Sequence, residues 1–134
     1  TMRLLKAEAL MHQDPTTNKQ QIVSLLNESR VGNGDLQPAA LTDPVGSMSD
    51  AQDPIKGADG DGATLWSMLK HEKRMESFAT LCGIAFYDDR GWGDLVEGTP
   101  VDLPIPGSEL LILEEAIYTT DVVGGTNKVS GQPE

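Results

Sequence analysis

The sequence predicts an α+β fold, in which N-terminal helices and a long irregular arm are joined to a small unit made of one helix and an antiparallel sheet. Apolar residues recur at helical spacing near the N-terminus and again after residue 62. Gly, Pro and Asp are concentrated between these two regions, and after residue 83 short apolar runs alternate with turn residues, as in a sheet. We therefore expect a helical segment (1–30), an arm or linker (31–62), a compact core (63–123) and a polar tail (124–134).

The N-terminal segment is predicted to form two short helices. Residues 2–12 are rich in Leu, Ala, Met and Glu, which are good helix formers. Asp14-Pro15 ends this stretch, because proline disfavours helical geometry in the residue before it. Residues 16–18 can cap a second helix, whose apolar side chains share one face until Gly32 stops it.

The predicted arm, residues 31–62, is defined by its composition. Six Gly, three Pro and six Asp lie among its 32 residues, and it contains no aromatic side chain. Such a segment buries too little apolar surface to offset the entropy lost on ordering. It is predicted to be either a disordered linker or an arm that becomes ordered across a neighbouring subunit. In the second case its contact residues would be Leu36, Leu41, Val45 and Ile55.

Residues 63–82 give the clearest helical pattern, with apolar side chains at three- and four-residue steps and charged side chains on the other face. Beyond Gly83 the apolar runs become short. We predict strands at 84–87, 110–113 and 116–123, a turn at 88–93 and the start of a returning strand at 95–96, with a short helix capped by Ser108 as an alternative for 108–116. Aromatic residues occur only between Trp66 and Tyr118, so the compact core is expected within 63–123.

The chain is strongly acidic, and the charge is uneven. It carries 21 Asp and Glu against 10 Lys and Arg, a net charge of −11, and ten of the acidic residues follow Tyr87. This charge argues against direct binding to nucleic acid and against electrostatic attachment to a membrane. The single cysteine, Cys82, excludes an internal disulfide framework. No apolar run is long enough to span a bilayer and no signal peptide is evident, so we expect synthesis in the cytoplasm.

Catalytic and metal-binding patterns are weak. Asp88, Asp89 and Asp94 could together hold a divalent cation, but Arg90 lies among them and can neutralise a carboxylate. Cys82 has no histidine within reach on its own helix. Since no general acid–base pair emerges either, we expect no catalytic residue, no cofactor and no metal, and a chain that is not an enzyme.

Two features suggest contacts with other proteins. Trp92 stands between two glycines, so its large ring is either folded back onto the core or presented to a partner. The segment 98–107 contains three prolines, and if extended it presents alternate apolar side chains on one side as a preformed contact ridge. These side chains are Val101, Leu103 and Ile105.

The sequence therefore predicts a non-enzymatic structural subunit of a larger assembly, with other protein subunits, of its own or another kind, as partners. Capsid-cementing (decoration) proteins and head–tail accessory proteins of phage virions share this organisation, which makes the virion an expected location by analogy of architecture. One alternative is an acidic regulatory or inhibitory protein that mimics the charge of nucleic acid. A further alternative is a small metal-dependent enzyme that uses the acidic segment 88–94.

Overall fold

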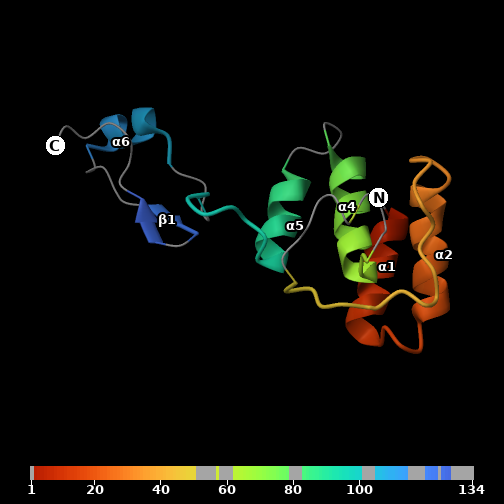
Figure 1. The fold of residues 1–134 in the computed structure, drawn as a ribbon. Coiled ribbons are helices and arrows are strands. Elements are labelled where there is room, and N and C mark those ends of the chain that lie inside the picture. The colour runs from red at the N-terminus through yellow and green to blue at the C-terminus, as the bar shows by residue number, and fades with distance from the viewer. Residues whose placement is uncertain are drawn as a thin grey trace. The chain divides into compact units, whose positions relative to one another are not determined.

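The chain forms two compact units, residues 1–92 and residues 93–134 (Figure 1). The computed structural model describes residues 2–50, 57, 62–78, 83–100, 105–114, 120–123 and 125–127. Unit 1 contains helices α1 (Met2–Gln13), α2 (Lys19–Arg30), α4 (Leu65–Ser77) and α5 (Ile84–Trp92). Unit 2 contains helix α6 (Gly107–Leu113) and strands β1 (Thr120–Val122) and β2 (Gly125–Asn127).

The predicted boundaries at residues 30 and 62 both fall inside unit 1. Helices α1 and α2 confirm the two N-terminal helices, and α4 confirms the first part of the helix expected at 63–82. Within the described residues, every helix is too short or too polar to cross a lipid bilayer.

The predicted α+β fold with an antiparallel sheet is wrong, because the described part of the chain is mainly helical. Residues 84–87, expected as a strand, begin α5, and residues 110–113 lie in α6. The strand pairing among the described residues is one short antiparallel hairpin, in which Thr120 of β1 is opposite Asn127 of β2. A run of four apolar residues carries no periodicity that separates helix from strand, so tertiary contacts decide its conformation.

The hydrophobic core of unit 1 lies between α1, α2 and α4, so residues outside the predicted core region 63–123 supply much of it, together with Trp66 and other residues of α4. Phe78 and Tyr87 are exposed. Aliphatic side chains and the ring of Trp66 pack closely between these helices. The core residues are Leu4, Ala7, Met11, Ile22, Val23, Leu26, Ala39, Ala63, Leu65, Trp66, Met68 and Leu69.

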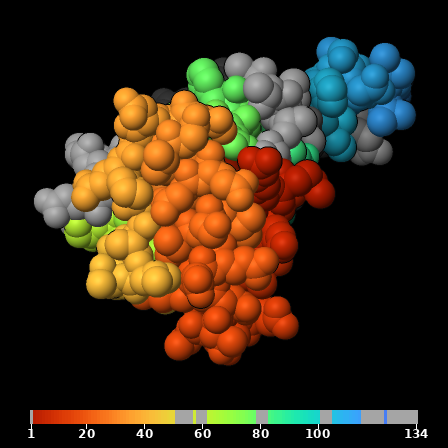
Figure 2. All heavy atoms as spheres, turned by 90° about the vertical axis from the view of Figure 1, so that its right-hand side faces the viewer, coloured from red at the N-terminus to blue at the C-terminus, as the bar shows by residue number. Residues whose placement is uncertain are grey.

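Residues 31–50, the longest described stretch of the predicted arm, are bonded to the helices of unit 1, and Figure 2 shows them together with α2 on one face. The Asn27 side chain donates to the Ala39 carbonyl at 2.9 Å and accepts from the Ala39 N–H at 2.7 Å. The carbonyls of Pro44 and Val45 accept from the N–H groups of Leu65 and Trp66 at 2.9 and 3.1 Å. These bonds satisfy donors that the first turn of a helix leaves unpaired. Residues 31–50 are therefore hydrogen-bonded to α2 and to the start of α4.

Gly46 is required where this segment meets the start of α4. Its φ is +73°, and a Cβ there would lie 2.5 Å from side-chain atoms of Thr64. Thr64 caps α4: its hydroxyl accepts from the Ser67 N–H at 3.1 Å, and the Ser67 hydroxyl accepts from the Thr64 N–H at 2.9 Å. An added methyl group would therefore strain both the backbone and the cap.

We expect Gly46→Ala to lower the free energy of unfolding by about 1–3 kcal/mol, the range for a residue held in an unfavourable backbone conformation. Urea unfolding followed by circular dichroism measures this change. The matched control is Gly91→Ala within α5, where a Cβ meets open space. This control should be neutral or should stabilise by up to about 1 kcal/mol through helix propensity. Equal losses for both variants would contradict the assignment.

Candidate functional site

The charged face of α4 is largely buried. Lys70, Glu72 and Lys73 are all buried, because α4 is packed against α1, α2 and α5 and also contacts residues 31–50. Burying a charged side chain lowers the stability of the fold unless the charge is paired. The partners of these three side chains therefore indicate their role.

One group of charged side chains joins three helices of unit 1; we call it the α4–α5 charge cluster. The Lys73 ammonium lies 2.7 Å from Glu8 Oε2 on α1 and 2.9 Å from Asp88 Oδ1 on α5. Next to it, Arg74 pairs with Asp89, whose Oδ1 lies 2.6 Å from the Arg74 Nη2. The second Asp88 carboxylate oxygen is buried and has no hydrogen-bond partner among the described residues. Two ion pairs therefore link helix α5 to helix α4.

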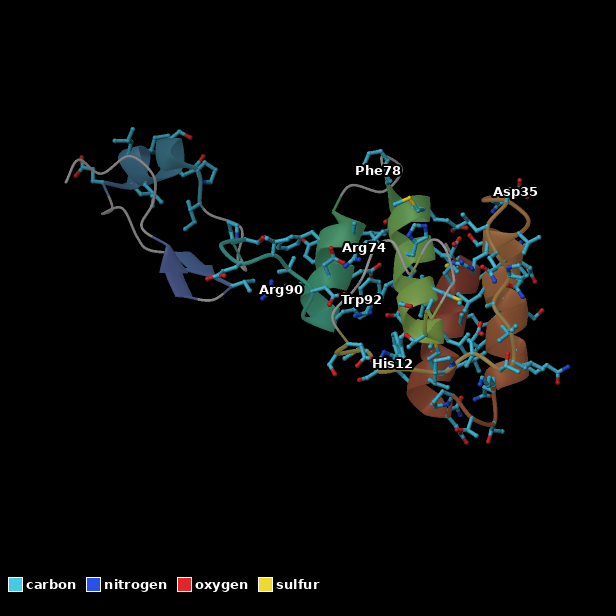
Figure 3. The ribbon with its side chains drawn as sticks, viewed as in Figure 1. His12, Asp35, Arg74, Phe78, Arg90 and Trp92 are labelled. Carbon is cyan, nitrogen blue, oxygen red and sulfur yellow. The ribbon has the colours of Figure 1, made fainter. Side chains whose placement is uncertain are left out.

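Trp92 completes the α4–α5 charge cluster. Its ring is buried, and its indole N–H donates to Glu8 Oε1 at 2.8 Å. The Lys73 ammonium lies 4.9 Å from the ring centroid and the Arg74 guanidinium carbon 5.8 Å from it, within the range of cation–π attraction. Figure 3 shows Arg74 and Trp92 between α4 and α5. Of the two alternatives for this residue, the ring is folded back onto its own unit.

The acidic segment 88–94 does not form the turn that the sequence predicted, because residues 88–92 belong to α5. Asp88 and Asp89 are bonded to Lys73 and Arg74, and a carboxylate held by a cationic side chain is poorly available to a divalent ion. In the part of the chain that the structure describes, no group of three or more His, Cys, Asp or Glu could hold a metal ion. Cys82 lies outside the described residues.

A second buried cluster is centred on Arg30 at the end of α2. Its side chain is 0% exposed. It donates to the carbonyls of Gly57 and Gln37 at 2.7 and 3.0 Å and lies 3.3 Å from Glu72 Oε1. The other Glu72 oxygen accepts from the Ser29 hydroxyl at 2.7 Å. Burial lowers the pKa of the Arg30 guanidinium, while the nearby carboxylates of Glu72 and Asp43 oppose this shift. Arg30 therefore links α2 to α4 and to the segment between them, through the carbonyls of Gln37 and Gly57.

A pocket of about 200 Å³ lies beside this cluster. It is smaller than the roughly 300–1,000 Å³ typical of small-molecule sites. Two of its polar side chains, Ser29 and Glu72, are bonded to each other. The pocket therefore supports no ligand assignment. Its lining residues are Ser29, Asn33, Gly34, Leu36, Glu72, Met75 and Glu76.

His71 is a partly buried titratable side chain of α4. Burial lowers its pKa from the ordinary 6.5; the charges of Arg30 and Arg74 add to this effect, and Glu72 opposes it. Below pH 6.5 the unfolded chain therefore binds a proton more readily than the folded chain. The contribution of His71 to stability is fully present above that pH and is lost as the pH falls toward the lowered pKa.

We expect the urea midpoint of the wild-type chain to fall between about pH 7.5 and 5.5, and His71→Gln to reduce that fall. Circular dichroism at several pH values measures both midpoints. An unchanged pH dependence in the variant would show that other groups cause it.

The predicted contact residues lie in different environments. Leu36 lines the pocket, and Val45 is half-buried against the core. Leu41 and Ile105 are exposed. Ile55, Val101 and Leu103 lie outside the described residues, so the contact ridge expected at 98–107 is described only in part.

Unit 2 presents an apolar surface that the sequence reasoning missed. Leu111, Ile112 and Leu113 are 82%, 75% and 62% exposed, and no residue of α6 is buried, all seven being described. We call these three side chains the α6 apolar row. They fall in the strand predicted at 110–113, whereas the structure has a helix here, as in the alternative for 108–116. The N-cap of this helix is Pro106 and not Ser108. The signal was present: four consecutive apolar residues cannot all face the core of a small helical unit.

No protein-family model, curated protein or solved structure matches the chain.

Proposed function

We propose that this chain is a non-enzymatic structural subunit of a larger protein assembly, and that it docks on other proteins through α6. The observation that carries the proposal is the exposure of the α6 apolar row. Several large apolar side chains exposed on one short element often mark an interaction site. Their burial would stabilise a complex by about 25 cal/mol per Å² of apolar surface removed from water.

The buried clusters of unit 1 support a structural role. Two ion pairs link α4 to α5, Lys73 with Asp88 and Arg74 with Asp89. A third, Arg30 with Glu72, links α2 to α4. These pairs hold helices together, whereas a catalytic site needs titratable groups that converge on a space for substrate. These ion pairs therefore stabilise the packing of the helices in unit 1. Membership of a phage virion, as a capsid-cementing or head–tail accessory protein, stays a prediction from the organisation of the sequence.

The proposal is tested by measuring the native mass of the tagged full chain in an extract of its source cells, by size-exclusion chromatography with light scattering. We expect the wild-type chain to elute in a complex well above its own 14.4 kDa. Leu111→Ser/Leu113→Ser should release the chain from that complex without changing its circular dichroism, because both side chains are exposed.

The matched control is Val96→Ser, which removes an exposed apolar side chain of unit 2 outside α6. This variant should remain in the complex. If the double serine variant also remains there, the docking role of α6 is excluded.

A further inference from the structure

Helix α5 differs from the other helices of unit 1 in what holds it in place. The hydrophobic core cluster is built from α1, α2, α4 and the segments beside them, and it contains no residue of α5, all nine of which are described. Trp92 is the one buried residue of α5; the others are half-buried or exposed. Helix α5 therefore lies against α4 at the edge of unit 1, outside the core (Figure 1).

Polar contacts supply most of the attachment of α5. They are the ion pairs Lys73–Asp88 and Arg74–Asp89 and the hydrogen bond from the Trp92 indole to Glu8. Water replaces such contacts when a helix detaches, so their attraction is largely offset by the desolvation that closure requires. The second Asp88 oxygen, buried without a partner among the described residues, adds to that cost. The apolar contribution that favours attachment is the burial of the Trp92 ring.

A glycine with positive φ stands at each end of α5. Gly83 has a φ of +83° and Gly93 a φ of +79°. Glycine enters and leaves this left-handed conformation with little steric cost. Residues at the ends of an element often act as hinges, because they absorb the backbone rotation when the element moves. Both ends of α5 can therefore turn while the helix itself is preserved.

We propose that α5 is a lid on the charged face of α4, which detaches as one unit and closes again while α1, α2 and α4 keep their packing. This inference does not rest on docking through α6. The structure shows the closed form. The open form keeps the whole hydrophobic core cluster and loses the burial of one ring, so it is accessible as a minor state. Opening exposes Lys73 and Arg74 to other molecules.

The lid also sets the length of the connection to unit 2. Unit 1 ends at Trp92, so α5 is its last element in the chain. With the lid closed, the connection begins at Gly93. With the lid open, residues 84–92 join it and add about 13 Å as a helix or about 30 Å if extended. Opening therefore gives unit 2 a longer reach from the three-helix core.

Native-state hydrogen exchange of the full chain, measured for single amides by NMR at urea concentrations below the unfolding midpoint, tests the lid. We expect the amides of residues 87–92 to share one opening free energy with a weak dependence on urea. They should exchange about tenfold or more faster than the most protected amides of α1, α2 and α4. Exchange of α5 with the rate and urea dependence of those helices would show that it opens only in global unfolding. Protection that falls steadily toward the ends of α5 would show fraying. Either result overturns the inference.

Asp89→Asn weakens one attachment of the lid without changing the hydrophobic core. We expect it to speed the exchange of all amides of residues 87–92 by about threefold to tenfold and to leave α1 and α2 unchanged. The matched control is Glu28→Gln, the same acid-to-amide change in the exposed pair with Arg3, which should leave α5 as in the wild type. If Asp89→Asn alters the exchange of α5 no more than Glu28→Gln does, the ion pairs do not hold a lid and the inference is wrong.

Discussion

Replacing Arg30 with methionine is expected to lower the free energy of unfolding by about 3–5 kcal/mol, the cost of breaking a buried ion pair by removing one partner. The Arg30 side chain is fully buried, and the Glu72 carboxylate that would be left behind is 5% exposed. The carbonyls of Gln37 and Gly57 would also lose their donor. Urea unfolding followed by circular dichroism measures the loss.

The matched control is Arg3→Met. Arg3 also pairs with a glutamate, Glu28, at 2.9 Å, but its side chain is 70% exposed. Exposed pairs contribute about 0–1 kcal/mol, so this variant should be nearly neutral. Replacing both partners, in Arg30→Met/Glu72→Met, should recover part of the loss because no charge remains buried alone. Similar small losses for Arg30→Met and Arg3→Met would contradict the role given to the Arg30 cluster.

Trp92→Ala is expected to cost about 3–5 kcal/mol, as for other buried aromatic residues. The variant loses the packing of the ring and its attraction to Lys73, and it leaves Glu8 without its indole donor. Trp92 is the buried residue of α5, so this helix should separate from α4 before the rest of unit 1 unfolds. Hydrogen exchange should show protection lost in α5 and retained in α1 and α2.

Tyr87→Ala is the matched control on the same helix, because Tyr87 is exposed. We expect it to cost less than about 1 kcal/mol and to leave the exchange of α5 unchanged. Trp92→Phe keeps an aromatic ring but removes the N–H donor, so its cost should lie between the other two. If Trp92→Ala does not loosen α5 more than Tyr87→Ala does, the ring is not the anchor of this helix.

The sequence predicted the helices whose signals are local. Helices α1, α2 and α4 have helix-forming composition, apolar periodicity or clear end signals within their own residues. Helices α5 and α6 were mistaken for strands because each begins or ends with a short apolar run that fits either structure. What decides α5 lies elsewhere in the chain: Asp88, Asp89 and Trp92 share one helical face and meet side chains of α4 and α1.

The buried clusters could not be predicted from local patterns for the same reason. Lys73 is 65 residues from Glu8 and belongs to the charged face of the helix predicted at 63–82. Nothing in a three- to four-residue period reveals that α5 and residues 31–50 cover that face. If residues 84–92 are taken as a helix, Asp88 and Trp92 lie one turn apart on the same face. This spacing is the local sign of the cluster.

The most direct test of docking through α6 is hydrogen exchange of the full chain, measured alone and in the native complex isolated from its source cells. We expect the amides of residues 107–113 to become protected in the complex, while those of α1 and α2 exchange as they do in the isolated chain. Equal exchange of residues 107–113 in the two samples would contradict it.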